Sequence, residues 1–156
     1  MKPVHRGIAV AILQCLIVLS LAGKYAVDRE RLPRVWVKTA PVDPNLPIRG
    51  RYVSLRLQVD GPSSVPYGSR QSRLSVENGR LTATVADSGV LILGSQGRWT
   101  IADPVAFFIS EGIPDPSRRA PGEELWVEVS VPQQGVPRPL RLGVKKDGVL
   151  TPLDLR

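Results

Sequence analysis

The chain has 156 residues, of which 42% are hydrophobic and 22% charged, so it can bury a core and is not expected to be disordered. Its net charge of +7 is concentrated near the N-terminus: residues 1–38 hold seven basic and two acidic side chains, against fourteen and twelve in residues 39–156. Because this excess brackets an apolar segment and no basic stripe follows, it suits anionic lipid and argues against nucleic-acid binding. The single cysteine, Cys15, lies in the apolar segment, so no internal disulfide can form.

The apolar core of this segment runs from Ile8 to Ala22. The segment can be extended to Val4–Val27 if Lys24 snorkels and Tyr25 lies at the membrane interface. Counted from Val4, it has about 24 residues and is long enough to cross the hydrocarbon layer as a helix. We therefore predict a cytoplasmic tail at residues 1–6, a transmembrane anchor at 7–27, a juxtamembrane linker at 28–33 and an exported β-domain at 34–156.

A cleaved signal peptide is the alternative to a retained anchor. Ser20-Leu21-Ala22 is an acceptable cleavage site, and cleavage after Ala22 would release a soluble secreted binder. No Pro or Gly interrupts residues 8–22, and a charged, helix-like continuation follows them, so we favour the anchor. Basic residues flank the segment on both sides, but a short N-terminal tail usually stays inside, which predicts an exported C-terminal domain.

From Arg34 onward, apolar residues recur with a period of two, which is typical of half-buried β-strands. The segment YVSLRLQV places four aliphatic residues on one face: Val53, Leu55, Leu57 and Val59. The segment LWVEVSV repeats the pattern with Leu125, Val127, Val129 and Val131. These two strands supply the predicted core.

Turn signals separate the shorter predicted strands. Three hairpin turns are expected, at Asn78-Gly79, at Asp147-Gly148 and around Gly94 and Gly97. The unbroken run Val105–Ser110 predicts a strand buried on both faces. About eight to ten short strands predict a mostly β fold, an antiparallel sandwich or barrel-like domain, beside the one N-terminal transmembrane helix.

Pro41, Pro44 and Pro47 recur with a period of three, which is the period of a polyproline II helix. Pro44 biases Asp43 away from the helical region, and the Asp43 carboxylate can accept a backbone N–H in an Asx-type turn. We interpret this segment as a stiff crossover between sheets rather than as a peptide ligand for an aromatic groove. Gly50 then permits a sharp bend before the next strand.

Residues 37–57, VKTAPVDPNLPIRGRYVSLRL, resemble the signature of the GDYXXLXY family, bacterial membrane-anchored proteins in which a PVDP segment precedes an R-G-D-Y-x-x-L-x-Y strand. The later segments AFFISEG and ELWVEVSV are similar to a second marker of that family. Arg51 replaces the Asp of the motif, and Leu57 replaces its final Tyr. The motif residues, a candidate binding site of undetermined role, are Pro41, Val42, Asp43, Pro44, Arg49, Gly50, Arg51, Tyr52 and Leu55.

The resemblance implies a single-pass protein of the bacterial inner membrane with an exported domain, and a multi-spanning membrane protein as its partner. Leu57 shares the face of Val53 and Leu55, so its departure from the motif is a change in core packing. Arg51 reverses a charge where the strand begins, and we predict that it pairs with an acidic residue at the sheet edge.

The sequence contains no clear catalytic constellation. His5, the only histidine, falls in the predicted cytoplasmic tail, which removes Ser-His and Cys-His arrangements from the exported domain. No metal-ligand spacing or phosphate loop occurs, so we expect no catalytic residue, no metal site and no cofactor. The alternative is an envelope hydrolase, either a glycosidase or a peptidase. Its candidate residues are the carboxylates of Asp103, Glu111 and Asp115, or a serine paired with Lys145 or Lys146.

Trp36 and Trp126 are out of phase with the aliphatic residues of their strands, so each faces away from the predicted core. For these rings and for Trp99 we expect partial burial beneath a loop such as PSRRAPG, with exposure for binding as the alternative. The leading hypothesis is a non-catalytic binding domain that contacts lipid through its N-terminal helix and works with a membrane protein partner.

Overall fold

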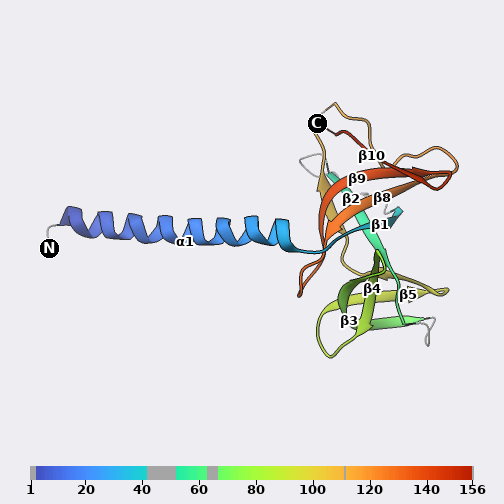
Figure 1. Ribbon diagram of the computed structural model, residues 1–156, viewed down its shortest axis with the longest axis horizontal. Coiled ribbons are helices and arrows are strands. Elements are labelled where there is room, and N and C mark those ends of the chain that lie inside the picture. Colours follow the sequence, from blue (N-terminus) through green and yellow to red (C-terminus); the bar gives the residue numbers. More distant parts are fainter. Residues whose placement is uncertain (1–2, 42–51, 63–66, 111, 156) are drawn as a thin grey trace. The chain divides into compact units, whose positions relative to one another are not determined.

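The computed structural model describes residues 3–41, 52–62, 67–110 and 112–155, and the chain divides into two compact units, Met1–Leu32 and Pro33–Arg156. The first unit contains helix α1 (Pro3–Arg31), shown in blue in Figure 1. Its segment Gly7–Val27 has 21 residues, is not buried against the protein, and is long and apolar enough to cross a membrane. Helix α1 continues past this segment into the residues predicted as a linker.

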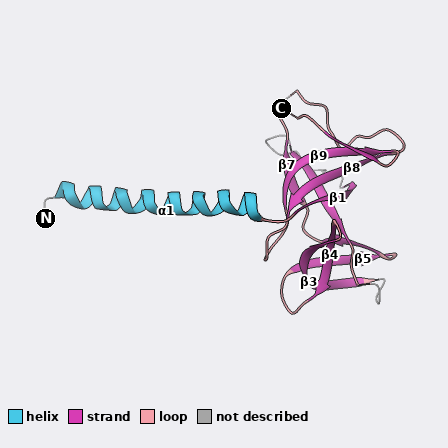
Figure 2. Ribbon diagram, in the orientation of Figure 1, coloured by secondary structure: helices cyan, strands magenta, loops and turns pink. Residues whose placement is uncertain are grey.

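The second unit is built from strands, shown in magenta in Figure 2. They are β1 (Arg34–Pro41), β2 (Tyr52–Val59), β3 (Gly68–Glu77), β4 (Arg80–Val85), β5 (Val90–Ser95), β6 (Arg98–Ile101), β7 (Val105–Phe108), β8 (Glu123–Ser130), β9 (Arg138–Lys146) and β10 (Val149–Pro152). The predicted mostly β, antiparallel class is confirmed.

All ten strands belong to one hydrogen-bonded antiparallel sheet with the order β10-β9-β8-β1-β2-β6-β5-β3-β4, and β7 pairs with β2 beside this path. In Figure 1, β3, β4 and β5 lie at one end of the domain, β8, β9 and β10 at the other, and β2 runs between the two groups. At the end of β2, Asp60 exchanges two backbone hydrogen bonds with β4, from its N–H to the Leu81 carbonyl and from the Ala83 N–H to its own carbonyl, each 2.8 Å long. The sheet curls at this bridge, but it is not closed into a barrel.

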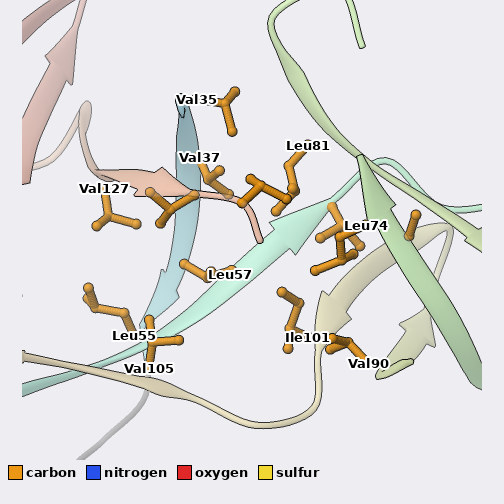
Figure 3. Packing of buried hydrophobic residues seen from close by; sticks show 14 of the residues in the cluster. Val35, Val37, Leu55, Leu57, Leu74, Leu81, Val90, Ile101, Val105 and Val127 are labelled. Carbon is orange, nitrogen blue, oxygen red and sulfur yellow. The ribbon is translucent and has the colours of Figure 1, made fainter. Parts of the chain in front are cut away.

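Strand β2 alternates between half-buried and buried residues along its whole length, as its sequence pattern predicts. Leu57 is fully buried and Leu55 is 2% exposed, so the face that carries them belongs to the core. In Figure 3, Leu57 lies between Val127 on one side and Leu74 and Ile101 on the other, all members of one buried cluster. The interpretation of Leu57 as a core residue is therefore confirmed.

Two-residue turns close the hairpins. Asn78-Gly79 and Asp147-Gly148 have positive φ at both positions, as a type I′ turn requires, which confirms both predictions. The third turn is Gln96-Gly97, with φ of 52° and 73°. Gly94 was predicted in this turn but lies in β5, where the ring of Trp99 packs against its backbone.

Two predictions about connections and burial are wrong. Val105–Ser110 was expected to be buried on both faces, but β7 ends at Phe108, whose side chain is 75% exposed. The reason is that, among the described strands, β7 pairs with β2 alone, and it presents one face to solvent. Strands β1 and β2 pair directly, with Thr39 opposite Leu57, so the proline segment joins neighbouring strands of one sheet and is not a crossover between sheets.

Candidate functional site

The face of β1, β8 and β9 that points away from the buried cluster carries an alternation of aromatic and charged side chains. We call it the outer face; its members are Trp36, Lys38, Glu124, Trp126, Glu128, Arg141, Gly143 and Lys145. They fall in register across the three strands: Trp36 lies opposite Glu128, which lies opposite Arg141, and Lys38 lies opposite Trp126. Cross-strand pairs of this kind are close enough for direct contact.

Trp126 is held between charged neighbours. Its indole Nε1 donates a hydrogen bond of 3.0 Å to one carboxylate oxygen of Glu124, whose other oxygen accepts a hydrogen bond from Lys38. The Lys145 ammonium lies 4.6 Å from the centre of the Trp126 ring, which is a cation–π distance. The hydrogen bond from Lys38, followed by that from Trp126, holds the pKa of Glu124 below its ordinary value.

Trp36, on the neighbouring strand β1, also has a cation close to its ring. The Arg141 guanidinium lies 5.9 Å from the centre of the Trp36 ring, and its Nε donates a hydrogen bond of 2.7 Å to Glu128. This hydrogen bond raises the pKa of Arg141. Gly143 leaves room for the Trp36 ring, because a Cβ added at Gly143 would lie 2.9 Å from it. Glu128, which lies between Trp36 and Arg141 across the strands, is only 8% exposed.

An open groove of about 1040 Å³ is the largest hollow described in the domain. The outer face forms one wall of the groove with Trp36, Lys38, Trp126 and Lys145. The other wall comes from the residues after β2 and from two hairpin turns: Asp60, Gly61, Pro62, Asn78, Gly79, Arg80, Gly97, Arg98 and Trp99. Both walls belong to the β-domain.

Trp99 is a structural part of the second wall. It is 4% exposed, and its ring is enclosed by two glycines, since a Cβ at Gly61 would lie 2.3 Å from the ring and one at Gly94 would lie 2.7 Å from it. Real side chains do not approach this closely, so both positions need glycine. The ring thereby packs the segment after β2 against β5 and β6.

The groove has a positive balance of charge. Among the described residues that line it are four cations, Lys38, Arg80, Arg98 and Lys145, and one carboxylate, that of Asp60. Lys38 pairs with Glu124, and Arg80 lies 3.5 Å from Asp60 in an exposed pair. Neither Arg98 nor Lys145 forms a salt bridge with a residue in the described part of the chain.

The motif residues are not gathered at this groove. The backbone of Pro41 ends β1 opposite Leu55, and Leu55 is a core residue. Tyr52 is half-buried on β2, with its ring centre 6.2 Å from that of the exposed Phe108. Val42, Asp43, Pro44, Arg49, Gly50 and Arg51 lie outside the described residues, and so does the predicted partner of Arg51.

The residues considered for hydrolysis make local contacts. Asp115 accepts hydrogen bonds from the Ser117 N–H and hydroxyl at 2.9 and 2.7 Å, as a turn-forming acid does. Lys146 lies 3.5 Å from Glu123, Asp103 is exposed, and Glu111 lies outside the described residues. Within the described ranges, no group of three or more His, Cys, Asp or Glu side chains could hold a metal ion.

The sequence pointed to part of this site. The phase of Trp36 and Trp126 predicted a face away from the core, and both are half-buried there, with Arg141 near the ring of Trp36 and Lys145 near that of Trp126. Arg80 and Arg98 were missed, because only the fold brings residues of two hairpins to the same groove as residues of β1 and β8. Comparisons with protein-family models, curated proteins and solved structures found no match to this chain.

Proposed function

We propose that this protein is a non-catalytic binding protein, held at a membrane by α1, and that its β-domain contacts a membrane protein partner through the groove. The single observation that carries the proposal is that one open groove is lined by two half-buried tryptophans and by two cations, Arg98 and Lys145, that form no salt bridge with a described residue. Tryptophan and arginine are the residues most enriched at the energetic centres of protein interfaces.

The shape of the groove favours a protein segment over a small molecule. Small-molecule sites enclose most of their ligand and are lined mainly by apolar groups. This groove is open, its volume of about 1040 Å³ is large, and charged residues lie along both walls. A segment of another protein can occupy such a groove without being enclosed by it.

The helix and the charge pattern support the location that we propose, which is the bacterial inner membrane with the β-domain exported. Gly7–Val27 can span a bilayer, and the basic tail before it favours a cytoplasmic N-terminus. The resemblance of residues 37–57 to the GDYXXLXY family points the same way. An intact mass that includes residues 1–22 in the membrane fraction would support this, whereas a soluble protein that begins at Gly23 would contradict it.

Site-directed photocrosslinking in the native membrane tests the binding proposal. A benzophenone amino acid at Gln58, which lines the groove, should give one adduct of defined mass with a membrane protein. The same residue at Thr84, which is exposed on β4 away from the groove, is the control. The adduct should weaken when Trp126→Ala is added. Equal adducts at both positions, or none at either, would contradict the proposal.

A further inference from the structure

We infer that the groove recognises an acidic, extended peptide segment of its partner, with Lys145 and Arg98 as the residues that bind its carboxylates. This inference rests on the proposed binding function and names the chemistry of the ligand. Its starting point is the imbalance of four lining cations against one lining carboxylate. A positive groove attracts negative segments and orients them.

The four cations differ in what they already bind. Lys38 is occupied by Glu124, and Arg80 is paired with Asp60. Arg98 is exposed at the β5–β6 turn and forms no salt bridge with a described residue. Lys145 is held over Trp126 and lies across the strands from Glu124, whose pKa its charge helps to lower, but it forms no salt bridge with a described carboxylate. Lys145 on β9 and Arg98 on β6 both line the groove, so we expect a segment that lies along the groove to pair with both.

Trp126 positions the cation on the first wall. With its ammonium 4.6 Å from the ring centre, Lys145 gains a cation–π interaction and loses freedom before a ligand arrives. Glu124 fixes the ring in turn by accepting a hydrogen bond from its Nε1, and Lys38 holds Glu124 through a second hydrogen bond. A pre-oriented ammonium binds a carboxylate with less entropy loss than a free lysine does.

The same contacts favour a peptide over a carbohydrate. Stacking of a sugar requires an open aromatic face, but Lys145 covers one face of Trp126, and Trp36 packs between Arg141 and Gly143. Each ring therefore has a cation near one of its faces, which brings positive charge to the groove. Aspartate and glutamate side chains match these cations through charge-assisted hydrogen bonds.

The test is fluorescence anisotropy with the full chain in a neutral detergent and short peptides carrying a neutral dye. The probes are a Glu-Gly repeat peptide, a Gln-Gly peptide of equal length, an oligogalacturonate and anionic lipid in mixed micelles. We expect saturable binding of the Glu-Gly peptide, about tenfold tighter than that of the Gln-Gly peptide at low salt, and weaker binding as salt rises.

Charge-reversal variants locate the binding. Lys145→Glu and Arg98→Glu should each weaken Glu-Gly binding about tenfold, because repulsion replaces a charge-assisted contact. Arg73→Glu makes the same change in net charge on exposed β3, outside the groove, and should weaken binding less than twofold. Lys145→Met keeps the bulk of the side chain and should still lose most of the affinity, which separates a charge effect from misfolding.

The outcomes distinguish this inference from the proposed function. If the Gln58 adduct forms but the Glu-Gly peptide does not bind, the partner is recognised by other chemistry and the acidic-peptide inference is wrong. Tighter binding of oligogalacturonate or anionic lipid than of the Glu-Gly peptide would also overturn it. Equal losses for Arg73→Glu and Lys145→Glu would show that net charge alone attracts the peptide, and would overturn it too.

Discussion

Trp99 and Trp126 both line the groove, but their surroundings are opposite. Trp99 is 4% exposed and is enclosed by the backbones of Gly61 and Gly94. Trp126 is half-buried, with its Nε1 bonded to Glu124 and an ammonium over its ring. The same residue type therefore contributes to stability in one wall and presents charge in the other.

The difference shows that the neighbours of a tryptophan decide its role. Glycines remove the side chains that would keep a large ring at the surface, so Trp99 is buried and gains its full apolar burial. Charged neighbours on β1, β8 and β9 satisfy the indole N–H and keep Trp126 at the boundary with solvent. Substitutions at the two walls should therefore separate stability from binding.

The largest expected effect is that of Trp99→Ala. Removing this buried ring should lower the free energy of unfolding by about 4 kcal/mol, because it leaves a cavity between β5, β6 and the segment after β2. Trp126→Ala should cost about 1 kcal/mol, since its ring is only half-buried. Urea unfolding of the full chain in mild detergent, followed by far-UV circular dichroism, measures both, and equal losses would refute the comparison.

Gly61→Ala comes next. The added Cβ would overlap the Trp99 ring, and relieving the overlap should cost about 2 kcal/mol. The same unfolding experiment measures this loss. In a Trp99→Ala background, most of the Gly61→Ala penalty should disappear, because the clashing ring is gone. An unchanged penalty in the double variant would mean that Gly61 is needed for another reason.

Arg141→Ala breaks the pairing on the outer face. It leaves the Glu128 carboxylate, whose side chain is 11% exposed, without the hydrogen bond from the Arg141 Nε. We expect a loss of stability smaller than that of Gly61→Ala, because water can reach the vacated position. Arg73→Ala, at an exposed position on β3, is the matched control and should leave the unfolding midpoint unchanged. Similar midpoints for the two variants would show that Glu128 needs no partner.

The smallest effect is the pH dependence that Glu124 contributes. Its folded pKa lies below the ordinary value of 4.5, so the unfolded chain takes up the proton first as the pH falls. The stabilisation is therefore fully present above about pH 4.5 and is lost as the pH falls through the folded pKa. The side chains of Glu124 and Lys38 are each 40% exposed, so the contribution is small.

Glu124→Gln should remove this contribution and flatten the decrease in stability below pH 4.5, as read from urea midpoints at a series of pH values. Above that pH, the variant should be slightly less stable than the wild type. A variant with the same pH profile as the wild type would show that the Lys38–Glu124 hydrogen bond does not contribute in solution.

Local sequence patterns predicted the strands well and their burial less well. The alternation in residues 52–59 is followed along the whole of β2. In β8 the same alternation fails after Trp126, where Glu128 and Ser130 are buried as well as the valines. The cause lies in the neighbouring strands, because Trp36 on β1 and Arg141 on β9 cover Glu128. The sequence of β8 does not indicate which strands lie beside it.

The segment Val105–Ser110 shows the opposite error, because it is more exposed than its sequence pattern predicts. An apolar run predicted burial on both faces, but β2 is the one partner of β7 among the described strands, and Phe108 faces solvent. Whether an apolar run is central or at an edge depends on strand order, which is a non-local property. The prolines after β1 likewise indicated a stiff connection, and the pairing of β1 with β2 decided that it joins neighbours.

By itself, the sequence determined the features that depend on neighbours along the chain. These are the long apolar helix, the period-two strands, the positive-φ turns at Asn78-Gly79 and Asp147-Gly148, and the outward phase of Trp36 and Trp126. Tertiary structure alone decided which cations line the same groove, because the pairing order of the strands brings Arg98 and Lys145 to it from positions 47 residues apart. The local sequence determines the face of a strand on which a side chain lies, and the pairing of the strands determines which residues it meets there.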